Sequence, residues 1–466
     1  MQRFIHLLAA VLILASPQIL PACSSFQLRS DTDIVYAHNL NQGDAGIPGQ
    51  MIINKRGVFK CGRTLSELTA AHPERVSDLV WISRYGSVTI NTFGQDMPDG
   101  GVNEAGLFIW EMSEDAQYPD DRHKPALSQN HWMQYALDTC MSVDEVIDVA
   151  HELTIDGWGW HYFVGDATGR TAAIAFIDGA PLVHTGEDMP IRALFNSPYD
   201  WEMEFSRMYE GHGGHYPVAV DDPTIPRFVR YDKLASEFKS TDDIVQYGLD
   251  MLATLKVHDE PEWSVLYDEA GRTLYFRTRL NPAVKTLAFD GVDFSNGQPD
   301  MALDIDQSKG GDVLGKFEPL TQKLVRRFLD DKLMAVLPED FFATDGLTND
   351  QALDNLSTHD SKDIVLAAQM LQSEWSNVFT KKDEEMAVTL TLYADKGAIT
   401  GGVELYENGQ QLKIGHIWMI DHHLEFTFFT PRGNYVLAKC DVNDDEMAVA
   451  LHGPESFFGD YILYRD

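Results

Sequence analysis

The cysteines are the most reactive side chains of this chain, and position singles out one of the four. Cys23 directly follows a short apolar leader, whereas the other three are scattered through the chain. No two cysteines form a CxxC pair, which argues against a zinc ribbon or a thioredoxin-like redox motif. An exported protein could bridge two of the remaining thiols, Cys61, Cys140 and Cys440, but the sequence does not give the connectivity.

Residues 1–22 have the pattern of a signal peptide. Arg3 supplies a positive charge, Leu7–Ala15 is an apolar run too short to span a bilayer, and Ala22 is the small residue that precedes a cleavage site. We therefore expect cleavage after Ala22 and export to the periplasm or the medium. No later stretch is apolar enough to predict a membrane span.

A cysteine at a signal cleavage site has two explanations. The run Leu20-Pro21-Ala22-Cys23 approximates a lipobox, whose cysteine is acylated and becomes a lipoprotein anchor, although the proline is unusual there. Alternatively, cleavage exposes a nucleophile, because an N-terminal cysteine carries a thiol of pKa ~8.5 beside an α-amine of pKa ~7.7–8.0. That amine can take the thiol proton, so one residue supplies nucleophile and base. The terminus alone supports both explanations equally.

The residues after Cys23 predict strands that would hold it rigidly. Alternating apolar positions indicate a strand over residues 23–28 and another over Ile34–His38, with the turn Ser30–Asp33 between them. Helical periodicity follows over Ala126–Cys140 and Val143–Leu153, and strands return near Gly159. Cys23 is therefore expected at the end of a paired strand.

Seven blocks in this order resemble the choloylglycine hydrolase family, which comprises penicillin V acylases, bile salt hydrolases and related linear-amide C–N hydrolases of the N-terminal-nucleophile (Ntn) superfamily. The blocks are Trp81–Ile90, Gly100–Leu107, Trp160–Gly169, Phe195–Pro198, Pro226–Arg230, Trp263–Val265 and Tyr275–Thr278. Each short motif alone is weak, but their collinearity from Cys23 to about Phe294 is hard to obtain by chance. The resemblance implies a four-layer αββα sandwich and no cofactor.

The resemblance also implies the roles of particular residues. Cys23 matches the nucleophile, which forms a thioester with the acyl group, and its own amine matches the base. Asn196 matches the side-chain donor to the oxyanion, and Ser113 supplies the backbone N–H where relatives carry Asn or Tyr. Arg227 matches an arginine that holds positive charge near the reacting centre and would favour the thiolate. Taken alone, Asn196 could shape a turn and Arg227 could form a surface ion pair.

The second strand departs from the family pattern Gly-Arg-Asn-x-Asp. His38 stands at the basic position and is only partly charged at neutral pH if its pKa stays near ~6.5. Asn41 replaces the aspartate that orients the N-terminal amine, and it accepts a hydrogen bond without adding negative charge. Asp44 is the nearest carboxylate that could substitute. Activity could survive with a shifted pH profile, or it could be lost.

The whole chain has 36 Lys and Arg against 72 Asp and Glu, a formal charge of −36. Such a surface disfavours nucleic acid partners, and it disfavours anionic membranes unless Cys23 is lipidated.

We expect an α+β fold in four segments. The first two are a signal peptide at 1–22 and the Ntn-hydrolase sandwich at 23–310. They are followed by a helical connector at 311–383, with helices over Phe317–Leu337 and Asp360–Trp375, and by a small all-β sandwich or barrel at 384–466.

The sequence predicts an exported amidohydrolase that cleaves a linear amide such as an N-acyl amino acid, an N-acyl lactone, penicillin V or a bile salt. Acyl transfer through the same thioester, and a catalytically impaired scaffold that acts as a binding lipoprotein, are the alternatives. The partner is a small acyl-amide, and a homo-oligomer remains open. No metal site is expected, because His212, His215 and the pair His422-His423 lack complete ligand sets. His161 is expected to be a satisfied core histidine.

Overall fold

The computed structural model describes most of the chain after the leader. The described residues are 23–41, 46–77, 79–256, 262–296, 298–307, 309–338, 341–342, 346–357, 373–381, 384–395, 398–405, 410–420, 423–429, 435–442, 446–453 and 459–465. The expected signal peptide and Asp44 lie outside them.

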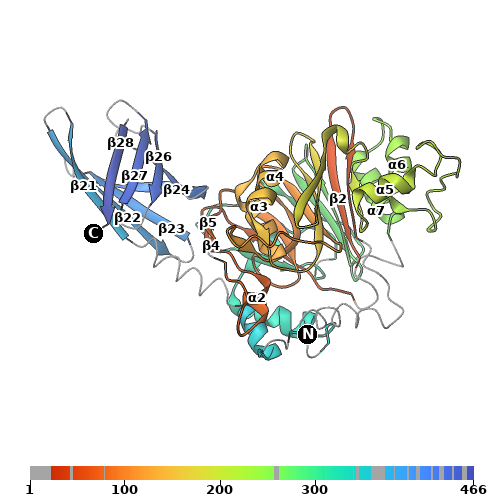
Figure 1. Cartoon of the computed structure of the whole chain (residues 1–466), viewed down its shortest axis with the longest axis horizontal. Coiled ribbons are helices and arrows are strands. Elements are labelled where there is room, and N and C mark those ends of the chain that lie inside the picture. The colour runs from red at the N-terminus through yellow and green to blue at the C-terminus, as the bar shows by residue number, and fades with distance from the viewer. Residues whose placement is uncertain are drawn as a thin grey trace.

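Two antiparallel sheets face each other at the centre of the larger part of the molecule (Figure 1). The first has the order β14-β1-β2-β15-β16-β17-β19, with one parallel pair between β17 and β19. Its strands are β14 (Ala193–Leu194), β1 (Ser24–Arg29), β2 (Ile34–Leu40), β15 (Trp263–Asp268), β16 (Thr273–Thr278), β17 (Lys285–Ala288) and β19 (Gly311–Asp312).

The second sheet has nine strands in the order β13-β12-β11-β8-β7-β6-β3-β18-β20. They are β13 (Ala180–Thr185), β12 (Thr171–Ile177), β11 (Trp160–Gly165), β8 (Phe108–Ser113), β7 (Pro98–Asn103), β6 (Ser87–Asn91), β3 (Gln50–Asn54), β18 (Met301–Asp304) and β20 (Glu318–Pro319). Strands β19 and β20 therefore add residues beyond 310 to both sheets of the sandwich.

Helices cover the outer faces of the two sheets. α3 (Gln129–Thr139) and α4 (Val143–Glu152) pack on the second sheet, and α7 (Ile244–Thr254) packs on β2 and β15 of the first, with α6 (Arg227–Glu237) and α5 (Tyr199–Ser206) beside β14 (Figure 1). Buried aromatic residues such as Tyr36 and Phe108, which stack at 5.3 Å, fill the space between the sheets. The four-layer αββα fold expected from the sequence is confirmed.

Local sequence signals explain where α3 and α4 begin. Ser128 accepts a hydrogen bond from the backbone N–H of His131 and caps α3, so this helix starts three residues later than the expected position Ala126. Residues Ala126–Leu127 instead form β9, which pairs in parallel with β10 (Thr154–Ile155). Ser142 and Glu145 form a complete capping box at the start of α4, where the sequence predicts a helix from Val143.

The C-terminal part is a closed eight-stranded antiparallel barrel in which each strand pairs with the next and β28 returns to β21 (Figure 1). Its strands are β21 (Ser373–Lys381), β22 (Glu384–Asp395), β23 (Ala398–Leu405), β24 (Gln410–Ile420), β25 (His423–Phe429), β26 (Tyr435–Val442), β27 (Glu446–His452) and β28 (Gly459–Arg465). Val436, Ala438 and Cys440 are all fully buried, which is the period of two expected for a barrel interior. The all-β C-terminal unit of the expected fold class is thereby confirmed as a barrel.

The two helices expected beyond residue 316 differ from the structure where it describes them. Within Phe317–Leu337, α8 covers only Gln322–Phe328, and a π-helical turn over Leu329–Leu333 follows it. Of the expected helix Asp360–Trp375, residues 360–372 lie outside the described residues, and Ser373–Trp375 belong to β21. Pairing of β21 with β22 and β28 places Ser373–Trp375 in a strand.

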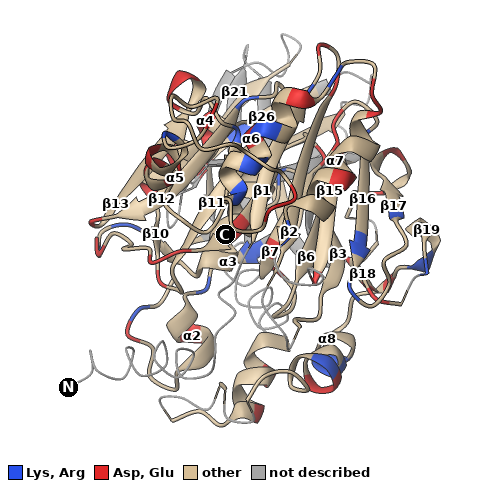
Figure 2. Cartoon of the chain, turned by 90° about the vertical axis from the view of Figure 1, so that its right-hand side faces the viewer, with Lys and Arg blue, Asp and Glu red and all other residues tan. Residues whose placement is uncertain are grey.

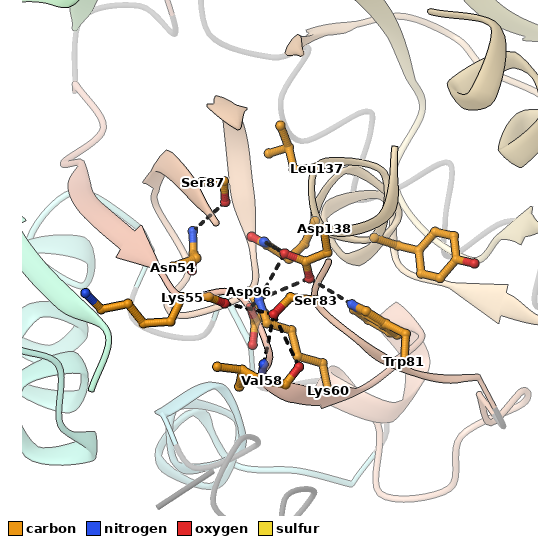
Figure 3. A network of polar contacts seen from close by, with 12 residues as sticks. Asn54, Lys55, Val58, Lys60, Trp81, Ser83, Ser87, Asp96, Leu137 and Asp138 are labelled. Carbon is orange, nitrogen blue, oxygen red and sulfur yellow. Dashed lines mark hydrogen bonds and ion pairs between the residues drawn. The ribbon is translucent and has the colours of Figure 1, made fainter. Parts of the chain in front are cut away.

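A buried ionic network joins a small hairpin to the sandwich (Figure 3). Lys60 lies on β4 (Phe59–Cys61), which pairs with β5 (Val80–Ile82). The Nζ of Lys60 is 2.5 Å from Asp96 Oδ1 and 3.1 Å from Asp138 Oδ2. Asp138, on α3, also accepts hydrogen bonds from Trp81 Nε1 and Gln134 Nε2, each at 2.8 Å. One cation therefore faces two carboxylates inside the protein.

The four cysteines all lie in the described part of the chain, and none of them forms a disulfide. Within the same described residues, no helix is long and apolar enough to cross a bilayer.

Candidate active site

Cys23 immediately precedes β1, which is flanked by β14 and β2. Its side chain is completely buried. Asn41 directly follows β2, and its backbone N–H donates a hydrogen bond to the Cys23 thiol. The strand pairing that the sequence predicts therefore places this thiol at a fixed point between neighbouring strands.

Arg227 connects Cys23 to Asn196. From the first position of α6, its Nη1 donates to the Cys23 carbonyl oxygen at 2.9 Å and its Nη2 donates to Asn196 Oδ1 at 3.3 Å. Asn196 follows β14, and its Nδ2 donates to the carbonyl oxygen of Ser113 at the end of β8 at 3.1 Å. With the Asn41 N–H bonded to the Cys23 thiol, five of the six predicted site residues thus lie in one continuous chain of contacts, and His38 does not.

The Arg227 guanidinium remains a cation at neutral pH although it is largely enclosed. Burial lowers its pKa to about 10, while Cys23 and Glu202 on α5 oppose that change. The guanidinium also lies 4.9 Å from the centre of the Phe195 ring. Because α6 begins here, its N-terminal dipole adds positive potential. Arg230 and Lys233 follow on the same helix, which is visibly basic among acidic loops (Figure 2).

The Cys23 thiol is protonated in this state. Burial raises its pKa well above the usual value, and Glu111 adds to the increase. The Asn41 N–H and Arg227 lower the pKa but do not outweigh burial. The expected tendency of Arg227 to favour the thiolate is therefore present in direction only.

His38 is part of the core between the sheets. It is fully buried, its Nδ1 lies 2.9 Å from Ser25 Oγ, and its ring stacks on Trp110 at 4.4 Å. Burial lowers its pKa to about 3, so this imidazole is neutral at neutral pH. The expectation of a partial charge is wrong, because the sequence pattern gives the strand position but not the loss of solvent around it.

Besides Glu111, two further carboxylates near the site were not predicted from the sequence. Glu262 directly precedes β15, and its backbone N–H donates to the Leu40 carbonyl, so Glu262 lies beside Asn41 at the end of β2. The Glu262 side chain is buried and raises the pKa of Cys23. Glu202 acts on Arg227 from α5, and burial raises its own pKa. Only the tertiary pairing of distant segments brings them here, so no local sequence signal marks them.

His161 and Glu114 form a second polar pair next to Asn196. His161, on β11, lies 2.6 Å through Nε2 from the Phe195 carbonyl oxygen and 3.4 Å through Nδ1 from Glu114 Oε2. The prediction of a satisfied core histidine is thus confirmed for Nε2 only, because Nδ1 has no hydrogen bond within the described residues. Among the residues described, no three His, Cys, Asp or Glu side chains group as metal ligands would.

Comparison with known proteins gives the following relatives. No family model matches the chain. The chain is 29% identical over 174 residues to penicillin V acylase from Pectobacterium atrosepticum, an alignment that covers 33% of this chain and 45% of that protein. The chain therefore matches less than half the length of this curated relative.

Solved structures add evidence on the fold. Penicillin V acylase from Agrobacterium tumefaciens aligns with a TM-score of 0.56 at 21% identity, covering 64% of this chain and 98% of that one. Conjugated bile acid hydrolase from Clostridium perfringens aligns with a TM-score of 0.48 at 15% identity, covering 62% and 98% of the two chains. The alignment with the acylase structure shows that the sandwich has the penicillin V acylase fold, and the expected resemblance is confirmed.

Proposed function

We propose that this relative of the penicillin V acylases is an amidohydrolase that cleaves a linear amide with Cys23 as its N-terminal nucleophile. The observation that best supports this function is the position of Arg227, whose guanidinium binds both the Cys23 carbonyl and Asn196 Oδ1. A nucleophile, a fixed cation and a side-chain amide donor are the parts that acyl transfer requires.

The first chemical step uses the α-amine that cleavage after Ala22 would expose. Because burial keeps the thiol protonated, the amine takes its proton as the sulfur attacks the amide carbonyl. The carbon–sulfur bond forms and the carbonyl oxygen becomes an oxyanion. Collapse of this intermediate breaks the carbon–nitrogen bond, and the leaving amine takes the proton from the α-ammonium. Water then attacks the thioester with the same amine as base, the carbon–sulfur bond breaks and the carboxylic acid is released. The leaving sulfur takes the proton from the α-ammonium, which restores the thiol and the free amine.

The residues around Cys23 hold the oxyanion and the amine. One N–H of Asn196 Nδ2 is bonded to the Ser113 carbonyl, which leaves its second N–H to donate to the oxyanion together with the Ser113 backbone N–H. Arg227 and the N-terminus of α6 add positive potential at the same place. Asn41 orients the amine, and because its side chain carries no charge, it favours the neutral, basic form of that amine more than a carboxylate would.

The substrate class that we propose is an acyl group joined to a small amine, as in an N-acyl amino acid, an N-acyl lactone, penicillin V or a conjugated bile acid. With a formal charge of −36, the chain gains no long-range attraction for anionic substrates, so affinity must come from burial of the acyl group. We further propose that the mature chain is exported to the periplasm or the medium.

The decisive experiment is intact mass spectrometry of the exported chain before and after incubation with a thiol-reactive acyl-amide analogue. The proposal expects a chain that begins at unmodified Cys23 and gains one adduct, and Cys23→Ala should gain none. The neutral His38 and the uncharged Asn41 favour a second candidate, a binding lipoprotein built on the same fold. A lipid-modified terminus, or a correctly cleaved chain without a Cys23-dependent adduct, would support that candidate instead.

Asn196→Ala should lower kcat for amide hydrolysis about 10²–10³-fold and change KM little, because the lost N–H is needed only when the oxyanion forms. The same substitution removes the acceptor of the Arg227 Nη2 hydrogen bond. Asn196→Asp is the matched control, since it keeps this acceptor but has no N–H, and it should be at least as inactive. Steady-state kinetics of both variants test this prediction, and an Asn196→Asp variant with wild-type kcat would contradict it.

A further inference from the structure

The segment that carries Asn196 is held from two sides by consecutive residues at the end of β8. Ser113 accepts a hydrogen bond from the Asn196 side chain at 3.1 Å. Glu114, the next residue, acts through His161, whose Nε2 lies 2.6 Å from the Phe195 carbonyl oxygen. The peptide between Phe195 and Asn196 is therefore fixed by an imidazole, and the Asn196 side chain by a backbone carbonyl.

The hydrogen bond to Phe195 determines where the His161 proton lies. A carbonyl oxygen only accepts, so Nε2 must carry hydrogen and Nδ1 of the neutral ring must be an acceptor. Glu114 Oε2 lies 3.4 Å from this Nδ1, and both atoms are buried and make no hydrogen bond within the described residues. Two acceptors facing each other inside the protein repel each other unless one proton lies between them.

We propose that Glu114 and His161 share one proton and act as a positioning pair that keeps the Phe195–Asn196 peptide, and so the Asn196 amide, in place for catalysis. This inference rests on the proposed function of Asn196. Loss of the shared proton leaves a carboxylate facing the imidazole lone pair, which drives the ring away and weakens its hold on Phe195. A small cavity lies beside the ring, lined by His161, His184, Leu194, Pro198 and Tyr199 among others.

The protonation of the two groups agrees with this geometry. Burial raises the pKa of Glu114 to about 7, with Asp115 adding to the increase, and burial lowers the pKa of His161 to about 4. The proton is therefore carried by Glu114 below about pH 7 and leaves to solvent above it.

Other titratable or charged groups surround the pair. They are Glu111 and Tyr118 on the β8 side, His184 on β13, Asp188 after β13, Tyr199 and Asp200 on α5, and Arg227 next to Phe195.

The pair predicts how the pH profile of hydrolysis should change in Glu114→Gln. In the wild type, two titrations act in opposite directions on kcat: the α-amine becomes neutral with a pKa of ~7.7–8.0, while Glu114 loses its proton near pH 7. The amide N–H of the introduced glutamine can donate to Nδ1 at every pH, so the falling limb should disappear and kcat of Glu114→Gln should exceed the wild-type kcat above about pH 7. His161→Phe removes the donor to Phe195 and should lower kcat between about 10- and 100-fold, since a displacement on the order of 1 Å can cost ~10²-fold.

His184→Gln is the matched control, because His184 lines the same cavity and contacts Asp188, Asp200 and the Tyr199 ring but makes no hydrogen bond to the Phe195–Asn196 peptide within the described residues. It should leave both kcat and the pH profile unchanged. A second readout does not need turnover: the ¹⁵N chemical shift of His161 Nδ1 should titrate near pH 7 in the wild type and be constant in Glu114→Gln. If His161→Phe fails to fold, Glu114→Gln and this titration still decide the question.

The outcomes separate the inference from the proposed function. A titrating Nδ1 together with loss of the falling limb in Glu114→Gln would support the positioning pair. Superimposable pH profiles of wild type and Glu114→Gln, or an Nδ1 shift that does not titrate, would overturn it while Cys23-dependent hydrolysis stands. Absence of any Cys23-dependent hydrolysis in the wild type would overturn the function, and with it the catalytic role of the pair, even if Nδ1 titrates.

Discussion

Cys23→Ala should abolish amide hydrolysis, lowering kcat by about 10⁴-fold or more, because no covalent intermediate can form without the sulfur. The remaining donors would still bind substrate, so KM should change far less than kcat. The fold should be retained. Removing one buried sulfur from the core should lower the free energy of unfolding by only about 1–2 kcal/mol. Kinetics with an N-acyl substrate and a urea unfolding curve for the same preparation test both statements.

A second variant separates the thiol from the amine of this residue. If one extra Lys is placed directly before Cys23 in a chain that would otherwise begin there, the thiol remains but the α-amine is moved out of reach. We expect a loss of activity close to that of Cys23→Ala, because the raised pKa of Cys23 leaves the thiol dependent on a base. Full activity of this extended chain would show that another group takes the proton.

The sequence was sufficient for the parts of the site that depend on local order along strands. The alternation around Cys23 and His38 predicts β1 and β2, and the blocks around Asn196 and Arg227 predict a common site, which the hydrogen bonds of Arg227 connect to Cys23. These features depend on neighbours in sequence or on a family pattern. Both kinds of signal can be recognised in one sequence.

The electrostatic state of the site could not be predicted in the same way. His38 and Cys23 each have a pKa moved far from its ordinary value by burial, and burial is a property of the whole tertiary structure. The contact between Glu114 and His161 likewise depends on the register in which His161 pairs with Met112 across β8 and β11. One sequence does not indicate which residues so far apart along the chain will be in contact.

Lys60→Met should destabilise the sandwich by about 3–5 kcal/mol at pH 8, because it leaves Asp96 and Asp138 ionised and buried without their cation. Burial alone lowers the pKa of Lys60, but Asp138 and Asp96 outweigh it and raise that pKa, so the lysine is charged in the folded state. Burial raises the pKa of Asp138 to about 6 even beside this cation. Urea unfolding followed by tryptophan fluorescence measures the loss.

The pH dependence of this loss distinguishes an uncompensated charge from a simple packing defect. Removing Lys60 raises the pKa of Asp138 further, so at pH 5.5 this carboxyl becomes neutral and the destabilisation should shrink by at least about 1 kcal/mol. A packing defect would cost the same at both pH values. Arg170→Met is the matched control, since Arg170 pairs with Asp144 at 2.8 Å on the surface and should cost no more than about 1 kcal/mol. A loss in Lys60→Met that is as small as in this control would mean that the buried network in Figure 3 does not depend on its cation.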